Sequence, residues 1–485
     1  MHVDLDPRAV PFRRAIAGAQ IETTPLAIFA WMVAIALLLR STFTPDTYFS
    51  LYAGRLDASG LPQRDALTVL AYGRSAIDQQ WLAHRLLFGA HELCGGAGVA
   101  LLAALCVGIA FALFAKQLRR HGARGGVFVL LLLLAVVGAA ANMPPRAQTL
   151  ALPLFVVVLD AALRERVSSL RTGQIALTGA AIVIWANVHG SVLLAALFFA
   201  VGAVVASVRR DRALRAWGCA IGAALCCLAS PYGVDLISYY RSLVGNSALA
   251  AVSPEWAPAG LTTQSLGIWC CVAACLALVG ARSRVLVSRE PLLTIVCAIL
   301  AVAAIQSIRM GIWLGFATPM LLARVLPVAS IRPLPRALTR PALPLGLLLA
   351  ALSFIFAFSG ARHYDALAPV AASSAAAAAA AERPSIRVLA DVATVGELLW
   401  SHPELGGRVA FDVRLELLKA TELRALQRYF SASGRDWERA ADGYGIVLLA
   451  LPERAVLARR LAHSVSFRRL FADTHGAVFV RTQRG

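Results

Sequence analysis

The sequence predicts an α-helical polytopic membrane protein with about eleven transmembrane helices and a small C-terminal α/β extracytoplasmic domain. Composition is the first reason: 59% of the 485 residues are hydrophobic and 15% are charged, whereas about a quarter of a soluble domain is charged. Apolar runs long enough to cross a bilayer recur along the first 360 residues. After about residue 385 the composition becomes charged, and short apolar runs alternate with helical patterns.

The apolar runs are interpreted as helices, because the alternating pattern of an outer-membrane barrel is missing from the sequence. The predicted spans are 25–41, 97–115, 126–141, 148–163, 174–188, 190–208, 214–230, 264–281, 291–307, 311–325 and 342–359. Residues 82–95 are amphipathic and short, so we expect them at the membrane interface or as a re-entrant segment.

The distribution of Lys and Arg predicts the orientation of these spans. The loops on the side of the N-terminus hold 21 of these residues, and the opposite loops hold 8 up to residue 310. Because cytoplasmic loops are enriched in Lys and Arg, we expect the N-terminus in the cytoplasm. With eleven spans, everything after residue 360 then lies outside.

Four parts follow from this topology. Residues 1–24 form a cytoplasmic segment, and 25–360 form the transmembrane domain, whose first outer loop is 42–96. The Ala-rich linker 361–384 is either a helix or a flexible spacer, since Ala is the best helix former. Residues 385–485 form the extracytoplasmic α/β domain.

The extracytoplasmic domain contains short apolar runs typical of strands and longer stretches typical of helices. Strands are expected at 386–392, 408–413, 445–451 and 477–482. Helices are expected at 414–430 and 453–464.

Charge, cysteines and motifs exclude several classes of function. The net charge is +19, but the Arg residues are scattered in short loops as topology signals, so no nucleic acid is expected as a partner. None of the nine Cys forms a C-x-x-C pair, and most lie in predicted spans, which indicates small buried hydrophobes. The sequence has no G-x-x-x-x-G-K-[ST], G-x-S-x-G or H-E-x-x-H motif.

Asp46, in "TPDTY" just after the first span, is the main candidate for chemistry. A carboxylate at the rim of a helical bundle can accept a proton from an acceptor hydroxyl or hold a divalent metal. The alternative is a helix N-cap after Pro45, and the two roles can coexist. Tyr48 is a candidate for substrate binding. In "DQQWLAHRL", Gln80 is another candidate for substrate binding. His84 is a general base, a hydrogen-bond donor to phosphate, or a polar residue on a solvent-exposed face.

Arg146, His189 and Arg309 are candidates for binding phosphate. Arg146 follows two prolines, and Arg309 lies between two apolar runs with almost no loop. A guanidinium matches the geometry of phosphate, although a single Arg can also extend to the lipid headgroups.

Three further candidates lie in other outer loops. Asn187, in "WANVHGS", caps the hairpin or contacts substrate. Glu255 and Trp256, in "SPEWAP", offer hydrogen bonds and stacking to a sugar ring, or belong to an ordinary loop.

Taken together, "DTY", "GRLDASGLPQRDALT", "DQQWLAHRLL", "WANVHGS" and "EWAP" resemble the GT-C superfamily of polyprenyl-phosphate-sugar-dependent membrane glycosyltransferases, in a bacterial branch. The resemblance covers nearly the whole chain. It implies that Asp46 is the functional carboxylate and that the chain lies in a bacterial cytoplasmic (inner) membrane. The tail has Asp412-Val413-Arg414 where related tails carry Asp-Gly-Arg, and no DxD pattern is present in the outer loops or the tail, so a divalent metal is left open and no cofactor is expected.

The resemblance implies an inverting glycosyltransferase that works in cell-envelope glycan or glycolipid assembly. Its partners would be a polyprenyl-phosphate-linked sugar donor, the lipid bilayer and a glycan, lipid or protein acceptor. Two other classes stay open: a transporter or flippase of a lipid-linked or anionic substrate, and a noncatalytic envelope-assembly scaffold. A transporter usually shows internal repeats and mid-membrane polar groups, and neither is visible in this sequence.

Overall fold

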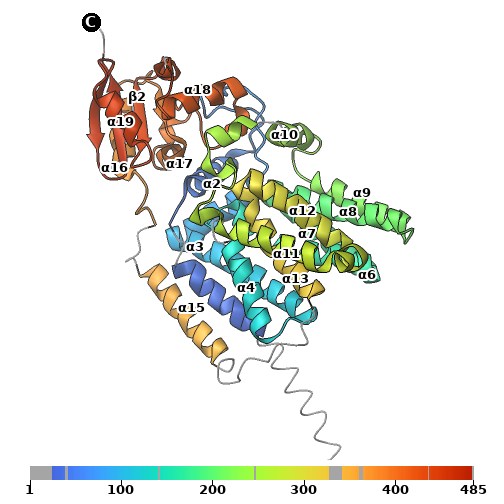
Figure 1. Cartoon of the computed structure of the whole chain (residues 1–485). Helices are drawn as coiled ribbons and strands as arrows, with labels where there is room; N and C mark the ends of the chain where they lie inside the picture. Colours follow the sequence, from blue (N-terminus) through green and yellow to red (C-terminus); the bar gives the residue numbers. More distant parts are fainter. Residues whose placement is uncertain are drawn as a thin grey trace, which may run out of the picture.

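The computed structural model describes residues 24–38, 42–139, 143–244, 247–326, 341–359, 364–434 and 436–482. A helical bundle forms one part, and a four-stranded sheet with its own helices lies against one end of the bundle (Figure 1). At the edge of the bundle the last long helix packs on the first, where the Trp31 indole donates a hydrogen bond to the Ala342 carbonyl at 2.9 Å.

An apolar helix lies at each predicted span. These are Thr24–Leu38, α3 (Trp81–Arg120), α4 (Gly125–Ala139), α6 (Leu152–Ser168), α7 (Thr172–Val188), α8 (Leu193–Val208), α9 (Ala213–Cys227), α11 (Leu266–Arg289), α12 (Pro291–Gln306), α13 (Gly311–Val325) and α15 (Ala342–Phe358). In the described part of the chain, 4 helices, counted with adjoining turns, are long and apolar enough to cross a membrane. The chain is therefore a multi-pass membrane protein, and the count of eleven crossings stays a prediction.

Helix α3 joins two segments that the sequence pattern separates. The predicted interfacial segment 82–95 is helical and runs into the span predicted at 97–115, with a break at Cys94 and Gly95. Gly95 has φ of +58°, in the left-handed region that glycine reaches without a steric penalty. The segment before the break is therefore free to follow a different direction from the span after it.

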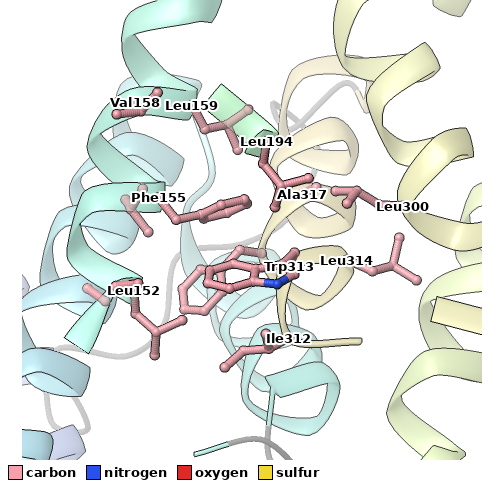
Figure 2. Close-up of a cluster of buried hydrophobic side chains, with 14 of the residues drawn as sticks. Leu152, Phe155, Val158, Leu159, Leu194, Leu300, Ile312, Trp313, Leu314 and Ala317 are labelled. Atoms are coloured by element: carbon pink, nitrogen blue, oxygen red, sulfur yellow. The ribbon is translucent and has the colours of Figure 1, made fainter. Parts of the chain in front are cut away.

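Large aromatic side chains fill the centre of the bundle (Figure 2). The rings of Phe155 on α6 and Trp313 on α13 lie 4.9 Å apart, and Trp185 on α7 packs 6.1 Å from Trp313. All three are buried, and aliphatic residues such as Leu152 and Leu300 surround them. This packing fixes α6, α7 and α13 against one another beneath the outer loops.

The C-terminal domain, called the outer domain after its predicted side of the membrane, is built on a sheet with strand order β1-β2-β4-β3. Its strands are β1 (Val388–Ala390), β2 (Ile446–Ala450), β3 (Phe467–Ala472) and β4 (Gly476–Arg481). β1 runs parallel to β2, and the other two pairs are antiparallel. Every residue of β2 is buried, because helices cover both faces of the sheet.

Three of the four predicted strands form, and one prediction is wrong. The segment 408–413 makes only isolated bridges, in which Val409 pairs with Val388 of β1 and with Thr68 of the first loop. This segment lies between β1 and the first loop, and it pairs with each of them over too few residues to form a regular ladder. The strand β3 was not predicted, because four of its six residues are exposed and its apolar pattern is weak. The helix expected at 414–430 begins only at Ala420, as α18 (Ala420–Phe430), and the second is α19 (Ala455–Ala462).

The Ala-rich segment is a helix, α16 (Val370–Ala381), rather than a spacer. Ala372, Ala376 and Ala380 are buried against the strands of the outer sheet. Small side chains at this spacing let the helix lie close to the sheet: a Cβ added to Gly476 of β4 would lie 2.6 Å from the Ala372 methyl.

The outer domain packs directly on the first outer loop. Helix α17 (Val392–Ser401) lies against α2 (Pro45–Leu56), as Figure 1 shows. The contact is close, because a Cβ at Gly396 would lie 2.5 Å from the Pro45 carbonyl oxygen. Phe49 and Tyr52 of α2 share an apolar cluster with Leu398 of α17.

Candidate active site

A cavity of about 280 Å³ lies where the outer ends of the bundle helices meet the outer domain. Its walls come from the first loop, the outer hairpins and a short segment of the outer domain. The polar lining residues are Asp46, Ser50, Asp78, Gln79, Gln80, His84, Arg146, Gln148, His189, Ser191, Tyr239, Tyr240, Ser307, Arg309, Arg414 and Glu416. Most of the polar candidates named from the sequence therefore converge on one space.

Asp46 faces this cavity because another residue caps its helix. Thr44 is the N-cap of α2, and it forms a capping box with Thr47. The alternative interpretation of Asp46 as the N-cap is thus wrong. Its carboxylate lies in the first turn, 3.2 Å from a guanidinium nitrogen of Arg146.

Arg146 is buried, with a side chain only 2% exposed, and two carboxylates hold it. Asp46 accepts from its Nη1 at 3.2 Å, and Glu255 accepts from the same nitrogen at 2.5 Å. The two prolines before it place the backbone, since the carbonyls of Pro144 and Pro145 accept hydrogen bonds from Thr149 and Thr47 at 2.5 and 2.7 Å. A desolvated cation at this point holds both carboxylates in place.

Glu255 links the two arginines. Its second carboxylate oxygen lies 4.0 Å from Arg309, whose guanidinium lies over the Trp256 ring at 5.3 Å from the centroid. Burial raises the pKa of Glu255, but the charges of Arg146 and Arg309 outweigh this and hold the pKa below its usual value. Trp256 lines the cavity, whereas Glu255 is not among its lining residues and its carboxylate contacts both arginines.

His189 lines the cavity as a neutral imidazole. Burial, with the charges of Arg309 and Arg146, holds the pKa of His189 well below its usual value. Its Nδ1 accepts the backbone N–H of Ser191 at 3.1 Å, so its proton is assigned to Nε2.

Gln80 and His84 also line the cavity, from the start of α3. The Nδ1 of His84 lies 2.7 Å from a carboxylate oxygen of Asp78. Gln79, from the same stretch, donates to the Ala186 carbonyl at 2.9 Å, and its buried carbonyl oxygen has no hydrogen-bond partner in the described residues.

Besides Glu255, two predicted substrate-binding residues do not line the cavity. Tyr48 donates a hydrogen bond to Asp365 at 2.6 Å and packs on Phe43. Asn187 accepts from the Trp81 indole at 2.8 Å, and its amide donates to two backbone carbonyls, both at 2.8 Å. The polar atoms of both side chains form hydrogen bonds within the protein, so both residues connect elements of the fold.

The outer domain supplies part of the wall, through residues 413–416. Arg414 anchors this segment by ion pairs with Asp65 of the first loop at 2.6 Å and with Asp412 at 2.5 Å. Glu416 faces the cavity, and no described cationic side chain forms an ion pair with it. The sequence carried no signal for these contacts, because residues about 350 positions apart come together only in the folded chain.

Solved structures with a similar arrangement of helices and outer domain identify the fold. ArnT from Cupriavidus metallidurans bound to undecaprenyl phosphate matches with a TM-score of 0.50 at 15% identity, over 96% of this chain and 98% of that chain. The Archaeoglobus fulgidus oligosaccharyltransferase in the apo form matches with a TM-score of 0.51 at 12% identity, over 95% of this chain and 75% of that chain. Both are GT-C proteins. This chain has the GT-C fold.

The GT-C fold confirms the resemblance drawn from the outer-loop motifs, at the level of the fold. The Archaeoglobus fulgidus oligosaccharyltransferase tethered with an acceptor peptide gives the same result, with a TM-score of 0.50 at 13% identity over 94% of this chain and 74% of that chain. No protein-family model and no curated protein match the sequence. The fold therefore comes from the structure, and what the site does is argued from its residues.

Proposed function

We propose that this protein is an inverting glycosyltransferase that moves a sugar from a polyprenyl-phosphate donor to an acceptor hydroxyl. The observation that carries the proposal is the convergence of Asp46, Arg146, Arg309 and neutral His189 on one cavity in a GT-C fold. An acid and a set of phosphate-binding groups are the two components that such a transfer needs.

Arg309 and His189 are the donor-phosphate ligands in this proposal. Arg309 is 19% exposed, and its ion pair with Glu255 is long at 4.0 Å, so a phosphate can bind it without displacing a short contact. The Nε2–H of His189 adds a neutral donor. Arg146 already has two carboxylate partners, so it adds positive charge and orients Asp46.

Asp46 is the general base. It takes the proton of the acceptor hydroxyl, whose oxygen forms a bond to the anomeric carbon of the sugar. The bond from that carbon to the phosphate oxygen breaks, and polyprenyl phosphate leaves with the electron pair, stabilised by Arg309 and His189. A single displacement of this kind inverts the anomeric centre.

The proposed setting is the outer face of a bacterial cytoplasmic membrane, in cell-envelope glycan or glycolipid assembly. The N-terminus lies in the cytoplasm and the outer domain outside, as the Lys and Arg distribution indicates. The acceptor is a glycan, a lipid or a protein. Gln80, His84 and Trp256 line the space where the sugar and acceptor would meet.

The test separates binding from transfer in the purified full-length protein. Undecaprenyl phosphate should bind the unaltered protein, and Arg309→Gln should weaken binding by about tenfold to a hundredfold, since a hydrogen bond to a charged group contributes about 1.5–3 kcal/mol. The matched control is Arg428→Gln, an exposed arginine on α18 that should bind as the unaltered protein does.

Asp46→Asn should keep this binding but lower the release of undecaprenyl phosphate from undecaprenyl-phosphate hexoses and pentoses by about 10²–10⁴-fold, with envelope lipids and glycans as acceptors. Asp46→Asn with full transferase activity would refute the assignment of the base. Lipid movement across vesicles without any transfer would favour a flippase, and absence of binding would favour a scaffold.

A further inference from the structure

A second group of polar side chains lies beside the cavity, apart from the Asp46–Arg146 pair. It consists of Asp57, at the end of α2, Asp78, in the loop before α3, and His84, in the first turn of α3. Each residue offers one ligand atom, and these three atoms all lie within 4.8 Å of one another. An imidazole and two carboxylates at this spacing are a ligand set suited to a divalent transition metal.

Asp57 provides an independent indication that something is bound here. Its side chain is buried, at 2% exposure, and its Oδ2 has no hydrogen-bond partner among the described residues. A carboxylate oxygen left unpaired in the interior is costly, and a second carboxylate next to it adds repulsion. A cation between the two acids would remove both penalties.

The surrounding structure holds the three ligands in place. The Arg85 guanidinium donates to the Asp57 backbone carbonyl, and the backbone N–H of Gln80 donates to Asp78 Oδ1 at 3.0 Å. Helices α2 and α3 approach so closely that a Cβ at Gly54 would lie 2.3 Å from the His84 carbonyl oxygen. Ligands on elements locked together in this way keep their geometry without the metal.

We propose that Asp57, Asp78 and His84 bind a single divalent transition-metal cation, with Zn²⁺ as the best match. The imidazole favours Zn²⁺ over Mg²⁺ or Ca²⁺, which prefer sets made of oxygen alone. Asp78 and His84 also line the cavity, so the cation has an open side toward it, as in sites with three protein ligands and one exchangeable position. The proposal does not depend on sugar transfer, because the metal binds without donor or acceptor.

The experiment measures Zn²⁺ on the purified full-length protein. The protein is stripped with a chelator, equilibrated with Zn²⁺ and desalted, and bound metal is counted by mass spectrometry. We expect one Zn²⁺ per chain, and at least about tenfold weaker binding in Asp57→Asn and His84→Gln. Asp46→Asn is the matched control: this acid lines the same cavity outside the group, and its loss should leave Zn²⁺ binding unchanged.

Co²⁺ in place of Zn²⁺ reports the ligands directly, since its visible absorption should change in His84→Gln and not in Asp46→Asn. Elution as a single species and unchanged tryptophan emission show that each variant is folded. The proposal is overturned if the unaltered protein retains no metal, if Asp57→Asn and His84→Gln bind Zn²⁺ as tightly as it does, or if Asp46→Asn removes the metal equally. If the unaltered protein retains no metal, Asp57 and Asp78 share a proton instead.

Discussion

At the residue scale, the site shows how much a neighbour decides what a charged side chain does. Asp46 was recognised from its position after the first span. The structure adds that Thr44, and not Asp46, is the N-cap of α2. Arg146 and Arg309 look alike in the sequence. In the fold, one is buried between two carboxylates, whereas the other is partly exposed with one distant partner. These contacts are the basis on which Arg146 is proposed to position Asp46 and Arg309 to bind phosphate.

Glu416 is the acid whose environment differs most from that of Asp46. Three carboxylates line the cavity within the described chain: Asp46 pairs with Arg146, Asp78 with His84, and Glu416 with no cation. Burial raises the pKa of Glu416 to about 7. The folded protein therefore keeps a proton on this group at pH values where the unfolded chain has lost it.

This difference predicts a pH dependence of stability. Because the pKa is raised on folding from about 4.5, the stability that Glu416 contributes is present at low pH and is lost as pH rises toward about 7. Glu416→Gln cannot ionise, so its melting temperature should exceed that of the unaltered protein by a few degrees at pH 8 and by less at pH 5. Thermal unfolding in detergent measures this. Glu453→Gln, an exposed acid of the same domain, should show no such difference. The prediction would be contradicted if the melting temperatures of Glu416→Gln and the unaltered protein changed with pH in the same way.

At the element scale, close helix contacts depend on glycines that the hydropathy pattern does not reveal. Helices α4 and α13 cross where Gly138 faces Gly315. In a membrane, association of helices relies on packing, so small residues at a crossing let two backbones approach. This crossing fixes α13, and with it Trp313 under the cavity.

Gly315→Ala is expected to destabilise this crossing. The added Cβ would lie 2.8 Å from the Gly138 carbonyl carbon and 3.0 Å from the Ala139 nitrogen, so the two helices must separate. Overpacking of this kind costs about 1–3 kcal/mol in the free energy of unfolding. Gly280→Ala on α11 is the control, because a Cβ there meets nothing within 4 Å. Equal thermal stability of the two variants would show that the crossing tolerates the methyl group.

At the scale of the whole molecule, the outer domain is a structural part of the cavity and is tied to the first loop by charge. Arg414 bridges Asp65 and Asp412, and Arg74 pairs with Glu422 of α18 at 2.5 Å. Asp65 and Asp412 are buried, so the Arg414 pairs are not screened by solvent as the ordinary surface pairs are.

Asp65→Asn is expected to loosen the outer domain on the bundle. Arg414 keeps Asp412 but loses its charged partner on the first loop, at a cost of about 1–3 kcal/mol. The outer domain should then be cleaved faster by trypsin, and amides of residues 413–418 should exchange faster. Asp235→Asn, an exposed acid on α10 (Asp235–Val244) without an ion pair in the described structure, is the control. Cleavage and exchange at the rate of the unaltered protein would argue that apolar packing of α17 on α2 suffices.

The sequence by itself determined the helical membrane class, the place of each apolar helix and the outer-loop candidates. Each of these depends on local hydropathy or on a residue type at a helix end, which a linear pattern contains. For the same reason the buried strand β2 was predicted and the exposed strand β3 was missed.

The tertiary structure alone decided which candidates share a cavity. It excluded Tyr48, Asn187 and Glu255 from the lining, brought Glu416 into it from the outer domain, and placed Asp57 beside Asp78 and His84. These relations join segments that are distant along the chain or turn back on one another. Hydrophobic packing of the helices, and of the outer domain on the first loop, sets them, and no local pattern records the result.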